Sequence, residues 1–140
     1  MKKKRIIFGI LTILWVAVIF GFSLQTGEKS GGMSLHIFMR TIGTWFPNIS
    51  AEVGHLILRK CAHFTEYLIL GALSFSALCH FWWSSLFCVC IAGADEILQL
   101  LVAGRYGSIY DVLIDIAGAI VGVIVIRFVI QFLKQRKKPS

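Results

Sequence analysis

The sequence predicts an all-α polytopic membrane protein with four transmembrane helices, and three observations support this. Hydrophobic residues make up 57% of the 140 residues, whereas charged residues make up only 15%. The mean hydropathy is +0.80, and long stretches carry no charge at all. A soluble domain of this length would need polar residues along every element to cover its surface. We therefore expect long helices whose apolar surfaces face lipid.

The positive charge is concentrated at the two ends of the chain, and the formal net charge is +7. One cluster comprises Lys2, Lys3, Lys4 and Arg5, and the other comprises Lys134, Arg136, Lys137 and Lys138. Basic clusters that abut apolar spans are typical of segments retained in the cytoplasm and attracted to anionic lipid. This pattern favours membrane lipids as partners and argues against nucleic-acid binding.

Four spans are expected, over about residues 6–24, 60–80, 82–101 and 109–133. The first is an uncharged run long enough to cross the roughly 30 Å hydrocarbon core at 1.5 Å per residue. Residues 51–80 are predicted to form one long helix, polar in its first turns and apolar in its later part. The junction at His80 is too short for a free loop, so the third span should follow through a tight turn.

Residues 25–50 are expected to form an extracytoplasmic loop between the first two spans, because they begin with the polar, glycine-rich stretch QTGEKSGG. Trp45 and Phe46, beside Pro47, suit either a segment at the membrane interface or a loop packed over the helices. Four crossings return the C-terminus to the side of the N-terminus. Together with the terminal basic clusters, this predicts a multi-pass cell-membrane protein with both termini in the cytoplasm.

Ionisable residues recur inside three of the expected spans, although each costs on the order of 2.5 to 3.5 kcal/mol there. The polar set consists of Arg59, Lys60, His63 and Glu66 in the second span, Asp95, Glu96 and Gln99 in the third, Asp111 and Asp115 in the fourth, and Arg105 in the turn before it. At 100° per residue, the set gives each helix one polar face. Counting from the outer end of each span places Glu66, Asp95 and Asp115 at a common depth of about 10 Å. We expect an intramembrane pocket that opens outward.

The polar set contains more negative than positive charges. Its carboxylates are Glu66, Asp95, Glu96, Asp111 and Asp115, whereas its fixed cations are Arg59, Lys60 and Arg105. A low-dielectric pocket does not hold uncompensated carboxylates. Either some carboxylates are protonated, or His63 is charged, or a cation or cationic ligand group occupies the pocket. An alternative is that these residues only join the helices, with Arg59 and Lys60 reaching the lipid headgroups.

Several segments resemble the VanZ-like family: RKCAHFTEY at residues 59–67, DEILQ at 95–99, GR at 104–105 and DVLIDIAG at 111–118. The stretch IFGFSLQTG at 19–27 is similar to the end of that family's first helix. The resemblance implies a small bacterial membrane protein with one domain over residues 1–140, in a family named for low-level resistance to the glycopeptide antibiotic teicoplanin.

The chain departs from that family at two points. Asp115 stands where many relatives have asparagine, which adds a charge. Ile97 and Leu98 replace a pair that often includes histidine, which weakens the interpretation of this segment as a source of metal ligands.

Two classes of function follow from the polar set. In the first, a non-enzymatic envelope protein uses the whole set to bind a polar headgroup or peptide, such as a lipid-linked cell-wall precursor or the glycopeptide itself, and so lowers glycopeptide susceptibility. In the second, a membrane-embedded enzyme processes a lipid or phosphate, with His63 or Glu66 as the catalytic base. Its candidate ligands for a divalent cation are Glu66, Asp95 and Asp111, with Glu96 and Asp115 as further carboxylates. Both classes of function are compatible with a monomer or an oligomer.

Overall fold

The computed structural model describes residues 2–41, 49–105 and 107–136, and these residues form helices without any strand. The helices are α1 (Lys2–Ser23), α2 (Gly27–Arg40), α4 (Ala51–Leu78), α5 (Phe81–Leu100) and α6 (Ile109–Arg136). Four of them, α1, α4, α5 and α6, are long and apolar enough to cross a membrane. The prediction of an all-α fold with four membrane-spanning helices is therefore confirmed.

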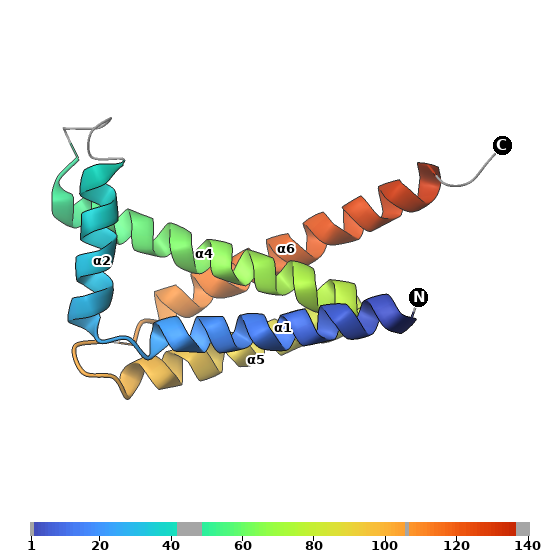
Figure 1. The fold of residues 1–140 in the computed structure, drawn as a ribbon, viewed down its shortest axis with the longest axis horizontal. Coiled ribbons are helices and arrows are strands. Elements are labelled where there is room, and N and C mark those ends of the chain that lie inside the picture. Colours follow the sequence, from blue (N-terminus) through green and yellow to red (C-terminus); the bar gives the residue numbers. More distant parts are fainter. Residues whose placement is uncertain (1, 42–48, 106, 137–140) are drawn as a thin grey trace.

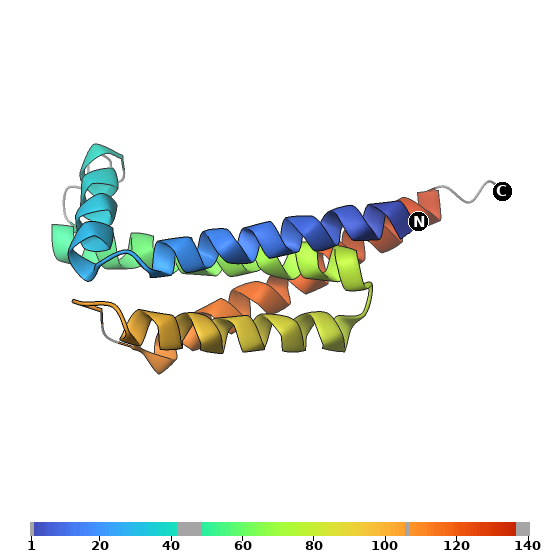
Figure 2. The ribbon, with the colours of Figure 1, turned by 60° about the horizontal axis from the view of Figure 1, so that its bottom comes forward.

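The four long helices run lengthwise side by side, and α2 stands across one end of them (Figures 1 and 2). α1 lies along α4 and α5, whereas α6 crosses α4 and diverges from it toward the C-terminus (Figure 1). The start of α1 and the end of α6 lie at the opposite end from α2, as four crossings require. We call the end where α2 stands the α2 end.

Helix α2 is a feature that the sequence did not reveal, because a polar, glycine-rich stretch was expected to be a loop. The structure makes residues 27–40 helical and packs them against the beginning of α4. Phe38 anchors this contact: its side chain is 2% exposed, and its ring occupies the space that a Cβ atom at Gly54 would take. Trp45, Phe46 and Pro47, proposed as an interfacial segment, lie outside the described residues.

Helices α4 and α6 share the largest interface of the fold, and glycines bring their backbones together. A Cβ atom added at Gly122 would collide with the carbonyl oxygen of Leu68, and one at Gly71 would collide with the carbonyl oxygen of Ala119. Small residues at helix interfaces allow this close approach in membranes, where van der Waals packing supplies much of the association energy. This packing fixes which face of α6 meets α4.

The predicted tight turn after α4 is present and is built around Cys79, whose φ of 56° lies in the left-handed region. His80 then caps α5: its imidazole Nδ1 accepts a hydrogen bond from the backbone N–H of Trp83 at 3.5 Å. Arg5 of α1 reaches the same turn, because its Nε and Nη2 donate to the carbonyl oxygens of Ala77 and Leu78 at 2.9 and 3.1 Å. These bonds satisfy carbonyls at the end of α4 that have no partner within the helix.

Candidate functional site

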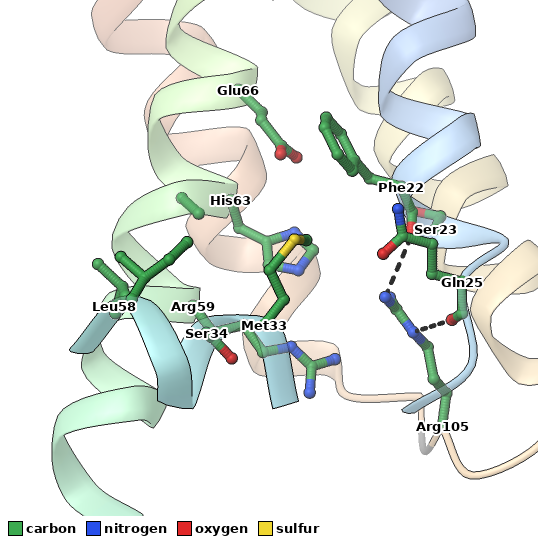
Figure 3. A pocket seen from close by; sticks show the side chains of 12 residues that line it. Phe22, Ser23, Gln25, Met33, Ser34, Leu58, Arg59, His63, Glu66 and Arg105 are labelled. Atoms are coloured by element: carbon green, nitrogen blue, oxygen red, sulfur yellow. Dashed lines mark hydrogen bonds between the residues drawn. The ribbon is translucent and has the colours of Figure 1, made fainter. Parts of the chain in front are cut away.

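A cavity of about 280 Å³ lies near the α2 end, between α1, α2 and α4 (Figure 3). Its lining includes Phe22, Ser23 and Gln25 at the end of α1, Met33, Ser34 and Ile37 on α2, Leu58, Arg59, Ala62, His63 and Glu66 on α4, and Arg105 from the turn before α6. Segments far apart in the sequence therefore form one cavity with polar and apolar walls.

Two arginines supply the positive charge of the cavity (Figure 3). Arg105 is held in place, because its Nε donates to the carbonyl oxygen of Gln25 at 3.0 Å and its Nη2 to that of Phe22 at 3.1 Å. Burial, and next the positive charge of Arg59, lower the pKa of Arg105. A guanidinium nevertheless stays charged at neutral pH. Within the described part of the chain, Arg59 makes neither an ion pair nor a side-chain hydrogen bond.

Glu66 and His63 lie on α4, deeper in the bundle than Arg59 (Figure 3). Both line the cavity, and the Glu66 carboxylate points across it toward Phe22 at the end of α1 (Figure 3). The cavity thus presents groups of both signs. Such an arrangement can bind phosphate at the guanidinium groups and an amine at the carboxylate.

His63 also belongs to a second polar group, in which it meets Asp95 of α5 and Asp115 of α6. One donor atom from each of the three residues lies within 4.8 Å of the others. The side chains are deeply buried, with 8%, 1% and 1% of their residues' surface exposed. His63 Nδ1 lies 3.4 Å from Asp115 Oδ1, which is within ion-pair distance but without hydrogen-bond geometry. Of the three carboxylates that the sequence placed at a common depth, Asp95 and Asp115 thus meet, whereas Glu66 is not part of this group.

Several polar atoms of this buried cluster have no hydrogen-bond partner among the described residues: His63 Nδ1, Asp95 Oδ1, Asp115 Oδ1 and the hydroxyl of the neighbouring Tyr67. The other oxygen of Asp95 is held, because Gln99 Nε2 donates to its Oδ2 at 3.0 Å. Gln99 Nε2 also lies 3.5 Å from the hydroxyl of Ser23. Each unpartnered buried polar atom costs on the order of 1 to 3 kcal/mol, so several together indicate a site rather than an ordinary core.

Three residues of the predicted polar set lie apart from both groups. Lys60 Nζ forms an ion pair with Asp111 Oδ1. Glu96 Oε1 accepts a hydrogen bond from the backbone N–H of Ser108, in the turn before α6. None of these three residues lines the cavity. The Lys60–Asp111 pair joins α4 to α6, and the hydrogen bond of Glu96 joins α5 to the turn before α6. Of the metal ligands suggested from sequence, Asp95 lies in the buried cluster, Glu66 lines the cavity, and Asp111 does neither.

Tyr67 of α4 is a buried polar residue outside the polar set predicted from the sequence. It is 0% exposed, and its hydroxyl has no hydrogen-bond partner among the described residues. Its position four residues after His63 places it on the same face of α4, which was a usable signal. The α2 residues that line the cavity gave no such signal, because the segment was not expected to fold back over α4.

The family model described as VanZ/LLP1 matches residues 8–131 of the chain. This range contains the residues that line the cavity and those of the buried cluster. No curated protein and no solved structure matches the chain.

Proposed function

The chain belongs to the VanZ/LLP1 family, and we propose that it is an envelope protein whose cavity binds the phosphate-bearing headgroup of a membrane lipid or lipid-linked cell-wall precursor. The observation that carries the proposal is the presence of Arg59 and Arg105 at one cavity near the end of the bundle. Arg105 is preorganised by its bonds to the end of α1, and Arg59 is free of ion pairs with other described residues. Guanidinium groups bind phosphate oxygens in a bidentate manner, and preorganisation lowers the entropic cost of binding.

The apolar part of the lining supports a lipid ligand over free phosphate. Phe22, Met33, Ile37 and Leu58 line the same cavity as the arginines. An amphiphilic lining suits a ligand whose polar head continues into an apolar chain. The cavity volume of about 280 Å³ suits a headgroup, with the acyl or prenyl chain remaining in the surrounding lipid. Glu66 would then accept an amine of a zwitterionic headgroup or of a wall-precursor peptide.

The consequence for the cell depends on orientation. The positive-inside rule favours cytoplasmic termini, which would make the α2 end extracytoplasmic and would open the cavity toward the cell wall. A protein that holds a lipid-linked wall precursor there would alter its access to a glycopeptide. The family's name supports the expectation that the chain lowers teicoplanin susceptibility.

Headgroup binding is tested by native mass spectrometry of the full chain in detergent. The probes are phosphatidylglycerol, phosphatidylethanolamine, undecaprenyl pyrophosphate and a diacylglycerol without phosphate. We expect retention of phosphate-bearing lipids only. Arg59→Gln should weaken binding by at least about 10-fold, since a charge-assisted hydrogen bond contributes roughly 1.5 to 3 kcal/mol.

The matched control is Arg40→Gln, which removes an exposed guanidinium at the end of α2 that does not line the cavity. It should leave lipid retention unchanged. Equal effects of Arg59→Gln and Arg40→Gln, or equal retention of diacylglycerol, would contradict the proposal. In cells, expression of the wild-type chain and of Arg40→Gln should raise the teicoplanin concentration that stops growth, and Arg59→Gln should not.

A membrane-embedded enzyme that processes a lipid or phosphate is the second candidate. It is favoured by His63, which lines the cavity and also belongs to the buried cluster, so that an imidazole lies between a headgroup site and two carboxylates. Phosphate release or a change in lipid mass on incubation with the same lipids would support this candidate. Unchanged lipid after prolonged incubation would support binding alone.

A further inference from the structure

We propose that His63, Asp95 and Asp115 bind one divalent transition-metal ion of the Mn²⁺, Fe²⁺ or Zn²⁺ class inside the helix bundle. The proposal does not rest on headgroup binding: Asp95 and Asp115 do not line the cavity, and only His63 belongs to both groups. It rests on three features of the buried cluster: the convergence of its donor atoms, its uncompensated charge and the fixed position of one carboxylate.

The donor atoms come from three different helices and converge on one point. One atom from each residue lies within 4.8 Å of the others. Donors around a four-coordinate ion at about 2.1 Å lie roughly 3.4 Å apart, so small side-chain rotations would complete the coordination. The three residues are at least nine-tenths buried, and His63 Nδ1, Asp95 Oδ1 and Asp115 Oδ1 have no hydrogen-bond partner among the described residues.

A divalent cation would balance the charge of the two carboxylates in the buried cluster. No lysine or arginine in the described ranges forms an ion pair with Asp95 or Asp115. Lys60 is paired with Asp111, and Arg105 donates to backbone carbonyl oxygens. A protonated His63 would balance only one of the two carboxylates. A divalent ion with a neutral imidazole would balance both, at a depth where an unbalanced charge costs several kcal/mol.

The neighbouring residues resemble the outer ligand shell of metal sites. Gln99 holds Asp95 by a hydrogen bond of 3.0 Å to Oδ2, whereas Asp95 Oδ1 has no hydrogen-bond partner among the described residues. Such outer hydrogen bonds orient ligating carboxylates. The hydroxyl of Tyr67 is a further oxygen donor without a partner among the described residues. One imidazole with two carboxylates favours Mn²⁺, Fe²⁺ or Zn²⁺ over Mg²⁺ and Ca²⁺, which prefer oxygen ligands alone.

Metal binding is tested on the untagged full chain in detergent, stripped with a chelator and titrated with Mn²⁺ or Zn²⁺. We expect one ion per chain, and a loss of affinity of at least about 100-fold in Asp115→Asn, since even outer-shell changes cost 10- to 100-fold. The matched control is Asp111→Asn, which removes a carboxylate one turn away on the same helix and outside the buried cluster. Equal affinities of the two variants, or no saturable binding, would overturn the proposal.

A second measurement gives its main result on the wild-type chain, so that result does not depend on how variants fold. Pulsed electron paramagnetic resonance of the Mn²⁺-loaded wild-type chain should show coupling to one ¹⁴N nucleus. Labelling the histidines with ¹⁵N should replace that coupling by the ¹⁵N signal. His63→Ala should remove it and His55→Ala, on the same helix, should keep it. Absence of nitrogen coupling in the wild-type chain would refute His63 as a ligand.

Discussion

Lys60 of α4 and Asp111 of α6 form an ion pair one helical turn closer to the α2 end than the contact between His63 and Asp115. The two contacts join the same helices but differ in charge balance and exposure. The Lys60 side chain is 40% exposed and that of Asp111 11%, whereas those of His63 and Asp115 are 10% and 1% exposed. The outer contact is therefore a pair of fixed opposite charges near the surface, whereas the inner contact is balanced only if His63 is protonated.

This difference predicts opposite effects of two similar substitutions on the metal-free protein. Asp111→Asn should lower the free energy of unfolding by no more than about 1 kcal/mol, because a partly exposed ion pair contributes little. Asp115→Asn should raise the thermal unfolding temperature, because it removes a buried carboxylate without a balancing charge. Thermal unfolding in detergent after chelation measures both. A lower unfolding temperature in metal-free Asp115→Asn would mean that His63 already balances the charge.

The α4–α6 interface predicts a steric effect at Gly122. Gly122→Ala places a Cβ atom against the carbonyl oxygen of Leu68 and should cost roughly 1 to 3 kcal/mol, as overpacking does elsewhere. Gly93→Ala on α5 is the control, because nothing lies within 4 Å of its added Cβ and alanine favours the helix. Denaturation by a graded detergent mixture compares the two. A stable Gly122→Ala protein would show that the helices can separate without loss of the fold.

The substitution Tyr67→Phe tests whether the Tyr67 hydroxyl contributes to the stability of the fold or to metal binding. The hydroxyl of Tyr67 is buried without a hydrogen-bond partner among the described residues, so its removal should raise the unfolding temperature of the metal-free chain. If the hydroxyl supports a bound ion, the same substitution should weaken Mn²⁺ affinity by about 10-fold. Calorimetric titration beside thermal unfolding gives both quantities. A large loss of stability without metal would reveal a structural hydrogen bond instead.

Glu66→Gln and Asp95→Asn should abolish the proposed protection against teicoplanin while folded protein remains in the membrane. Glu66 lines the cavity and Asp95 belongs to the buried cluster, so each substitution removes a charge from a proposed binding group. Glu52→Gln, in the exposed first turn of α4, is the control and should be silent. Growth assays combined with quantified membrane fractions test this. Disappearance of both variants from the membrane would favour a role in joining the helices.

Orientation is tested by cysteine labelling in a chain whose four native cysteines are replaced by serine. A reagent that cannot cross the membrane should label a cysteine placed at Gly31, on α2, and should miss one placed at Pro139. The basic clusters at both ends predict this result. The reverse labelling pattern would direct the cavity toward the cytoplasm and would exclude direct contact with wall precursors.

Much of the fold was predictable because lipid imposes strict demands on sequence. An uncharged run of sufficient length has few alternatives to a transmembrane helix, so the first span was evident. Counting residues along straight helices also placed Glu66, Asp95 and Asp115 at one depth. The structure brings Asp95 and Asp115 together, whereas Glu66 lines the cavity. Depth follows from the rise of 1.5 Å per residue and needs no tertiary information.

The direction of each polar face did not follow from the sequence. Asp111 and Asp115 share a face of α6, yet one pairs with Lys60 and the other meets His63. Their partners depend on the crossing of α4 and α6, and that crossing is set where Gly122 lies against the backbone of α4. The members of the polar set were predictable from the sequence, but their division between a cavity, a buried cluster and a surface pair was not.

The amino-acid sequence by itself determined the all-helical fold and the number and approximate bounds of the apolar spans, because these depend on hydropathy and helical length alone. Only the tertiary structure decided that α2 lines the cavity, that the Tyr67 hydroxyl is buried without a partner among the described residues and that Asp111 pairs with Lys60 outside the buried cluster. Those outcomes depend on how helices rotate and pack against one another, and packing is settled by side chains that are distant in sequence.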